Sequence, residues 1–148
     1  MKPRINFYGG VGDVTGANFQ LTYGESSILV DCGMFQGCDE CEERNYEAFP
    51  FDPVAIDALI VTHAHQDHIG RIPRLMREGF KGIIYSTAPT KELAGIMLSD
   101  ALNVMTQHAQ RESKIPLYEI EDIESAMEHW KTIPYHGEFE PAENIKIK

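Results

Sequence analysis

The segment His63-Ala64-His65-Gln66-Asp67-His68 decides how this sequence is interpreted, because it places three histidines and a carboxylate within six residues. It follows residues 56–61, a short apolar run that is typical of a buried strand. Residues two apart in an extended segment point the same way, so His63 and His65 can bind one cation together. Asp67 and His68 lie past a bend into a helix, where they can serve a second cation.

The donor groups of this segment point to a transition metal. Imidazole with carboxylate suits Zn²⁺ best, with Mn²⁺ or Fe²⁺ as further choices, and the absence of ligating thiols argues against a purely structural zinc. The alternatives are surface histidines gathered by chance and a single structural metal ion. Four ligands in this order at a strand-to-helix junction are hard to obtain by chance, which favours a reactive metal site.

Short strands are expected on both sides of this segment. We predict strands at residues 5–8, 17–23, 26–30, 56–61 and 82–85, and an alternating strand beginning at Ile145 and Ile147. Gly24-Glu25 is expected to form a hairpin turn. An alternating strand needs a partner and a continuation to bury its apolar face, so the ending at Lys148 predicts a domain that is cut rather than completed.

Three helices are predicted, at residues 69–80, from about Thr90 onward, and at 119–130. The first is expected to turn its apolar face to the sheet and its arginines to solvent, namely Arg71, Arg74 and Arg77. These arginines form a modest basic face, for which a solvated helix surface is favoured over an RNA contact. The alternation of strands and helices indicates layered α/β structure.

Length and charge place limits on the class of protein. A chain of 148 residues with a formal charge of −10 is one soluble domain that repels polyanions on average, although bound cations would reverse the field near a metal site. The apolar stretch at residues 56–62 is too short to cross a bilayer, and the first four residues lack the apolar core of a secretory signal. We therefore expect a cytoplasmic protein without a membrane partner.

The three cysteines, Cys32, Cys38 and Cys41, are an odd set in a chain with no export signal. Reduced thiols are therefore expected, and structural disulfides are not. Cys38 and Cys41 form a C-x-x-C pair, but a structural zinc site normally needs two more ligands nearby and only Cys32 is close. Ordinary loop or buried cysteines are the favoured interpretation.

The pattern H-x-H-x-D-H after a hydrophobic strand resembles the signature of the metallo-β-lactamase fold. The closer resemblance is to the β-CASP branch of that fold, which contains RNA-processing nucleases and some DNA-repair relatives. The segments that carry this resemblance are residues 14–18, 28–37, 62–73 and 85–90. Together they span most of the chain.

The resemblance implies an α/β fold, the N-terminal half of a metallo-β-lactamase αββα sandwich in which helices flank a mixed sheet. Asp31 matches the first motif of the family, an aspartate that orients the site. The second motif implies the metal ligands His63, His65, Asp67 and His68. A complete site would hold two zinc ions, with catalytic roles for Asp31 and for Asp67, which helps to position the attacking water.

In the resembled family the remaining ligands and the β-CASP cap lie beyond the position of Lys148. Residues 1–148 are therefore expected to be the N-terminal part of a metallo-β-lactamase domain, with the remainder of that domain and the cap absent. A half-site leaves each cation short of ligands, so metal affinity should fall by orders of magnitude. The chain is expected to be inactive alone.

Other polar residues are assigned ordinary roles. His108 and His129 are expected on helix surfaces, and His136 and Asp13 in solvated loops. Gly9, Gly10 and Gly12 do not stand in the register of a dinucleotide-binding fingerprint, and Thr90-Lys91 resembles a helix start more than a phosphate loop.

The function implied by the resemblance is that of a metal-dependent ribonuclease, endo- or exonucleolytic, which cleaves phosphodiesters with a two-metal-activated water. One alternative is a non-catalytic fragment that needs a complementing chain, and another is a small-molecule hydrolase of the same fold, of the thioesterase or lactamase type. RNA is the expected substrate partner. A homodimer or a complementing chain is left open as a protein partner.

Overall fold

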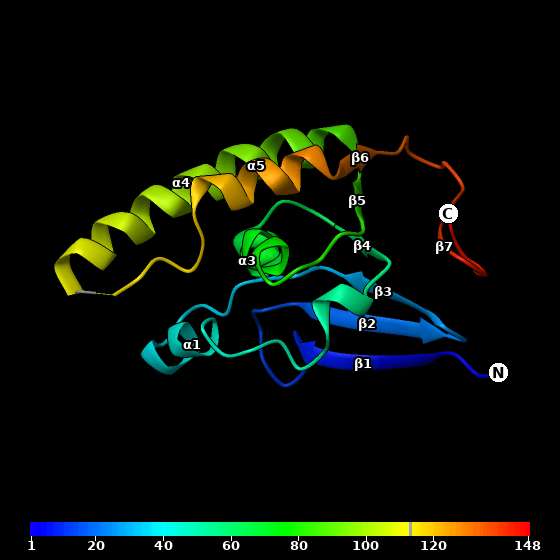
Figure 1. The fold of residues 1–148 in the computed structure, drawn as a ribbon, viewed down its shortest axis with the longest axis horizontal. Helices are drawn as coiled ribbons and strands as arrows, with labels where there is room; N and C mark the ends of the chain where they lie inside the picture. The colour runs from blue at the N-terminus through cyan, green and yellow to red at the C-terminus, as the bar shows by residue number, and fades with distance from the viewer. Residues whose placement is uncertain (113) are drawn as a thin grey trace.

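The main sheet has the strand order β1-β2-β3-β4-β5-β6 in a computed structural model, which describes residues 1–112 and 114–148 (Figure 1). Its strands are β1 (Arg4–Gly9), β2 (Asn18–Tyr23), β3 (Ser26–Val30), β4 (Ala58–Ile60), β5 (Ile83–Ser86) and β6 (Trp130–Thr132). The first three strands pair antiparallel, whereas β3 to β6 run parallel. The predicted α/β class with a mixed sheet is confirmed.

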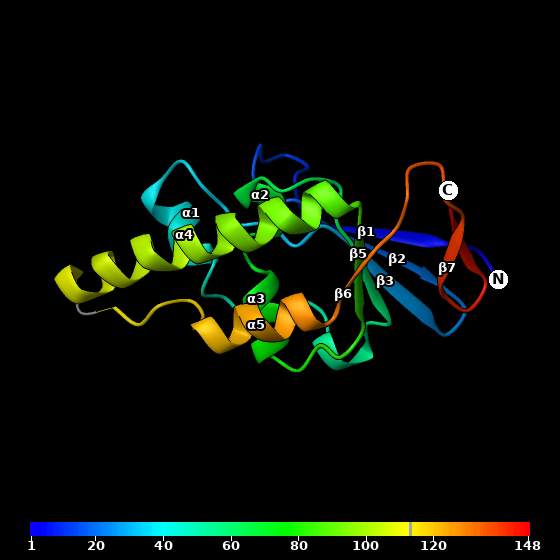
Figure 2. The ribbon, with the colours of Figure 1, turned by 90° about the horizontal axis from the view of Figure 1, so that it is seen from above.

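Helices cover one face of this sheet (Figures 1 and 2). They are the 3-10 turn η1 (Pro53–Ala55), α2 (Gln66–Ile69), α3 (Ile72–Arg77), α4 (Ala88–Glu112) and α5 (Ile120–Glu128), whereas α1 (Asp39–Arg44) has no buried residue and lies beyond the end of the strands. The core joins Leu29, Leu59 and Ile84 of the sheet to Leu75 and Leu98 of the helices, all of them fully buried. Within the described residues no helix combines the length and apolar character needed to cross a membrane.

The opposite face of the sheet is covered only in part. The hairpin of β7 (Phe139–Ala142) and β8 (Ile145–Ile147) packs there through Ile145, which contacts the cluster around Ile28. On the edge strand β1, Ile5 and Phe7 pair with residues of β2 on this same face and remain 57% and 59% exposed. Both chain termini lie at the end of the molecule away from the free tip of α4 (Figures 1 and 2).

The single helix predicted at residues 69–80 is interrupted: α2 ends at Ile69, and α3 occupies Ile72–Arg77. Pro73 stands in the first turn of α3, where its missing N–H is tolerated, and it could not serve inside one continuous helix. The N–H of Arg71 donates instead to the carbonyl of Cys32 at 3.0 Å. The break therefore ties the helical region to the segment that follows β3.

The predicted solvent-facing set of arginines is wrong for Arg71 and Arg74, whereas Arg77 is exposed as predicted. Arg71 is only 4% exposed, and its Nε donates to the carbonyl of Gly33 at 2.7 Å. Arg74 pairs with Glu78 at 2.6 Å. Arg77 forms an ion pair with Asp122, so each of the three arginines is bound to an acceptor within the protein.

The predicted helix at 119–130 ends earlier than expected, and its last residue begins a strand. Trp130 is 3% exposed, pairs with Ile84 of β5 and donates its indole N–H to Ser86 Oγ at 2.8 Å. A buried partner on β5 thus overrides the local helical pattern. Residues Phe139–Ala142 form β7, a strand that was not predicted.

The expectation of reduced thiols is wrong for one pair. Cys38 and Cys41 form a disulfide, with their Cα atoms 5.0 Å apart. Cys38 caps the N-terminus of α1, which brings it beside the residue three positions on. Cys32 is a free, buried cysteine, and burial raises the pKa of its thiol to about 12, so this thiol stays protonated and unreactive.

Candidate metal centre

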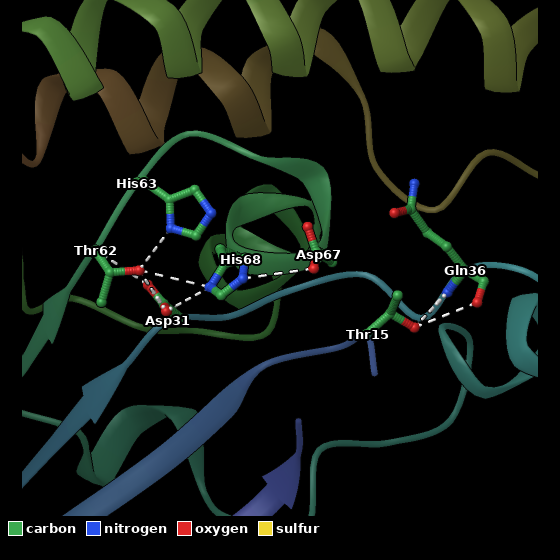
Figure 3. A network of polar contacts seen from close by, with 7 residues as sticks. All are labelled: Thr15, Asp31, Gln36, Thr62, His63, Asp67 and His68. Carbon is green, nitrogen blue, oxygen red and sulfur yellow. Dashed lines mark hydrogen bonds and ion pairs between the residues drawn. The ribbon is translucent and has the colours of Figure 1, made fainter. Parts of the chain in front are cut away.

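The predicted ligands gather where two neighbouring parallel strands end. Asp31 directly follows β3, and the segment that starts at His63 follows β4 after two residues. Ligand sites in open α/β sheets form at the carboxyl ends of strands, because side chains from adjacent strands meet there. Figure 3 shows Asp31, Thr62, His63, Asp67 and His68 converging at this edge.

Asp31 is the buried centre of the cluster, with 1% of its surface exposed. Its Oδ1 accepts from the backbone N–H of Thr62 at 2.8 Å, and its Oδ2 lies 2.7 Å from His68 Nδ1. Its φ of 59° lies in the left-handed region, which costs a non-glycine residue about 1 kcal/mol or more. Asn18 Nδ2 donates to its carbonyl at 2.8 Å, which helps to hold this conformation.

His68 is oriented by Asp31 at one ring nitrogen and lies beside Asp67 at the other. With Nδ1 against Asp31, its Nε2 faces Asp67 Oδ2 at 3.5 Å. A histidine that donates one ring N–H to a carboxylate and leaves the other nitrogen free has the arrangement of a metal ligand. Asp67 and His68 therefore offer one oxygen and one nitrogen side by side.

His63 and His65 form the second pair of donors. Their ring centroids are 4.7 Å apart, and the ring of His63 lies 3.9 Å from that of His68. Partial burial lowers the pKa of His63, and the neighbouring imidazoles of His68 and His65 lower it further. The ring of His63 is therefore neutral at neutral pH, which is the form that binds a metal.

The donors suit zinc by type, but they do not close around an ion. Among residues 1–112 and 114–148, no group of three or more histidine, cysteine, aspartate or glutamate side chains is arranged to hold one metal ion. The arrangement is an imidazole pair beside an imidazole–carboxylate pair. Each pair needs two further donors for the four-coordinate geometry of zinc, one of which can be a water molecule.

The segment after β3 positions the ligand segment through backbone hydrogen bonds. The N–H groups of Cys32 and Met34 donate to the carbonyls of His68 and Gln66, both at 2.9 Å. Gly33 lies between them, and a Cβ there would collide with the backbone carbonyl of Asp67. Glycine at position 33 therefore permits the close backbone approach on which the site is built.

Several positioning residues are absent from the sequence-based set. Thr62 and Asn18 both bind Asp31, and neither is a metal-type donor that spacing would single out. Asn18 is fully buried at the start of β2, and the signal that the sequence offered was an asparagine within the strand predicted at residues 17–23.

The remaining histidines lie on other elements. His108 is exposed on α4, and His136 is exposed in the segment between β6 and β7. His129 follows α5, with its Nδ1 2.8 Å from the carbonyl of Ser125. Asp13 forms an ion pair with Arg44 at 2.9 Å.

The fold and this site define a class of protein, an α/β domain that carries histidine and carboxylate donors at the ends of parallel strands. The chain belongs to the metallo-β-lactamase superfamily, whose model matches residues 18–138. Zn²⁺-bound PqqB from Methylobacterium extorquens has the same fold, with a TM-score of 0.51 and 15% identity over 89% of this chain and 38% of that one. The predicted family is confirmed.

Relatives with higher sequence identity are named as proteins that act in RNA metabolism. The chain is 43% identical to ribonuclease TTHA0252 of Thermus thermophilus over 132 residues, which are 89% of this chain and 28% of the relative. It is 33% identical to the transcription termination factor FttA of Methanocaldococcus jannaschii over 144 residues, 97% of this chain and 22% of the relative. The chain thus spans about a quarter of the length of these relatives, and their names agree with the predicted resemblance to RNA-processing nucleases.

Proposed function

We propose that this chain carries part of the active site of a metal-dependent ribonuclease of the β-CASP branch. The observation that carries the proposal is His68, held at Nδ1 by buried Asp31 and leaving Nε2 free beside Asp67. Similarity to a protein named ribonuclease supports RNA as the substrate class. Action on RNA would place the reaction in the cytoplasm.

The proposed ligands are His63 and His65 for one zinc ion, and Asp67 and His68 for a second. Bound there, the two ions would acidify the attacking water and stabilise charge on the phosphodiester. Asp67 would accept a hydrogen bond from that water and orient it toward phosphorus. Asp31 would act through His68, keeping its Nδ1 protonated and its Nε2 aimed at the site.

We further propose that residues 1–148 form the N-terminal part of a metallo-β-lactamase domain. Two observations support this: the donors do not close around an ion within the described residues, and the sheet face opposite the helices is partly bare at Ile5 and Phe7. In this proposal, polypeptide corresponding to the rest of the relatives supplies further ligands, the covering of that face and the cap. A second copy or a complementing chain is the alternative source.

The test measures zinc content and cleavage of a fluorescent RNA for residues 1–148 and for a form extended through the downstream coding sequence. The extended form should bind two zinc ions and cleave RNA, and His65→Ala should abolish cleavage with little change in the circular dichroism spectrum. His108→Ala, on the exposed surface of α4, is the matched control.

Three outcomes would count against these proposals. Cleavage of RNA with two bound zinc ions by residues 1–148 alone would refute the partial-domain proposal. Hydrolysis of a β-lactam or thioester by the extended form with RNA left intact would refute the branch assignment. Full activity of the His65→Ala variant would refute the ligand assignment.

A further inference from the structure

Thr62 stands among the polar groups on which the proposed metal centre depends (Figure 3). Its Oγ1 lies 2.8 Å from Asp31 Oδ2 and 3.0 Å from His63 Nδ1. The same atom is 3.5 Å from His68 Nδ1. One hydroxyl group therefore touches the orienting carboxylate and a proposed ligand of each ion.

The number of protons on these groups fixes the direction of their hydrogen bonds. A carboxylate only accepts, so the short contacts of Asp31 Oδ2 require a proton from the Thr62 hydroxyl and another from His68 Nδ1. A threonine hydroxyl has one proton, and donation to Asp31 uses it. The contact to His63 is then a hydrogen bond only if His63 Nδ1 carries the proton and Thr62 Oγ1 accepts it.

This assignment fixes which nitrogen each ring presents. A neutral imidazole protonated at Nδ1 has its lone pair on Nε2, which is the atom free to bind a metal. For His68 the carboxylate of Asp31 selects this form directly. Within residues 1–112 and 114–148, no carboxylate forms a hydrogen bond with His63, so the selection of its tautomer depends on the threonine hydroxyl.

We propose that Thr62 is a positioning residue that sets the tautomer of His63, relaying the charge of Asp31 through its hydroxyl so that His63 presents Nε2 to the site. The relevance to zinc rests on the proposed function. The tautomer itself is a property of the metal-free chain, and it can be measured without zinc or RNA.

The matched pair of variants is Thr62→Val and Thr62→Ser. Valine keeps the shape and the backbone N–H that donates to Asp31 Oδ1, but removes the hydroxyl, whereas serine keeps the hydroxyl. Long-range ¹H–¹⁵N spectra of the metal-free protein, at a pH where the histidines are neutral, distinguish protonated from unprotonated ring nitrogens. His63→Gln and His68→Gln variants assign the signals.

In the parent protein and in Thr62→Ser, both His63 and His68 should show a protonated Nδ1 and an unprotonated Nε2. In Thr62→Val, His63 should lose this pattern and redistribute between tautomers, while His68 keeps it because Asp31 is still present. Zinc affinity should fall about tenfold in Thr62→Val and stay within about twofold in Thr62→Ser.

An unchanged His63 pattern in Thr62→Val would overturn the inference. A change of equal size in His68 would overturn it as well, because general loosening of the site would then explain both. Thr62→Ala serves as the second hydroxyl-free variant if the valine form does not fold. If the tautomers behave as expected but zinc binds equally well without His63, the proposed ligand set fails while the role of Thr62 in the tautomer stands.

Discussion

Asp31 combines three properties that rarely coincide in one residue: near-complete burial, a left-handed backbone and a carboxylate that accepts from two different residues. A strained, buried acid persists only where its surroundings over-determine its conformation. Asn18 holds its carbonyl and Thr62 holds its side chain. Strain of this kind supports a role for Asp31 in the site over a purely structural one.

The first prediction is that Asp31→Asn weakens zinc binding by about 10- to 100-fold. The amide would turn a donor toward His68 Nδ1, which would favour the tautomer protonated at Nε2 and block the proposed ligand atom. Competition with a chromogenic chelator measures the affinity. Asp13→Asn, in an exposed ion pair, should bind zinc like the parent, and equal affinities for both variants would contradict the role of Asp31.

Arg71 shows how tertiary contacts change the meaning of a charged residue. Its guanidinium carbon lies 4.8 Å from the ring centroid of Phe35 and 5.1 Å from that of Phe49, and its Nε binds Gly33. It therefore links α3 to the segment that supports the ligands. A lysine would keep the charge but lose the planar stacking and this hydrogen bond.

We predict that Arg71→Lys lowers the free energy of unfolding by about 2 kcal/mol. Arg77→Lys, at a more exposed ion pair with Asp122, should cost under about 0.5 kcal/mol. Urea denaturation followed by circular dichroism measures both. Similar losses in the two variants would show that the buried contacts of Arg71 contribute little.

At the scale of elements, the site depends on the close approach of the irregular stretch after β3 to the ligand segment, whose second half is helix α2. The stretch after β3 and the ligand segment are joined by backbone hydrogen bonds on both sides of Gly33. These bonds follow the parallel pairing of β3 with β4, but they join the stretch after β3 to helix α2 and not to an extended strand. Any side chain at position 33 would force the segments apart.

Gly33→Ala should therefore destabilise the protein by about 2 kcal/mol and weaken zinc binding, because its Cβ meets the carbonyl of Asp67. Gly95→Ala is the opposite case, since a Cβ there meets Met127 no closer than 3.4 Å inside helix α4. That variant should be stabilised by up to about 1 kcal/mol. Thermal unfolding measures whether each variant is less or more stable than the parent protein. A Gly33→Ala variant as stable as the parent would refute the close-approach argument.

The element boundaries show where local pattern stops being informative. The strand Ser26–Val30 and the turn at Gly24, whose φ is 62°, are as predicted, because alternation and turn chemistry are local properties. The split of residues 69–80 and the strand at Trp130 differ from the prediction. Both depend on partners more than 35 residues away in sequence, Cys32 for Arg71 and Ser86 for Trp130.

At the scale of the whole molecule, the two faces of the sheet are unequal. The helical face buries a continuous core, whereas the opposite face is covered, within the described residues, only by the β7–β8 hairpin and leaves Ile5 and Phe7 exposed on an edge strand. An apolar edge of this kind favours association with other apolar surfaces. It is also the surface that our partial-domain proposal assigns to further polypeptide.

For residues 1–148, the double substitution Ile5→Thr with Phe7→Thr should reduce binding of the dye ANS and reduce association at high concentration. The free energy of unfolding should change by less than about 1 kcal/mol, because both side chains are largely exposed. Ile28→Thr, at a 1% exposed position on the same face, should cost more than about 2 kcal/mol. If the double variant binds as much ANS as the parent, the dye binds to a surface other than the one formed by Ile5 and Phe7.

The sequence by itself determined the donor types, their spacing and the α/β class, because these follow from local backbone periodicity and side-chain chemistry, and its motifs resemble those of the family that was then confirmed. Only the tertiary structure decided that Asp31 binds His68 across 37 positions, that Thr62 joins them, that Arg71 is buried and that Cys38 pairs with Cys41. The physical reason is the range of the interactions. Which nitrogen of a histidine is free, and which charge is buried, depends on groups that the fold brings together and that local spacing does not specify.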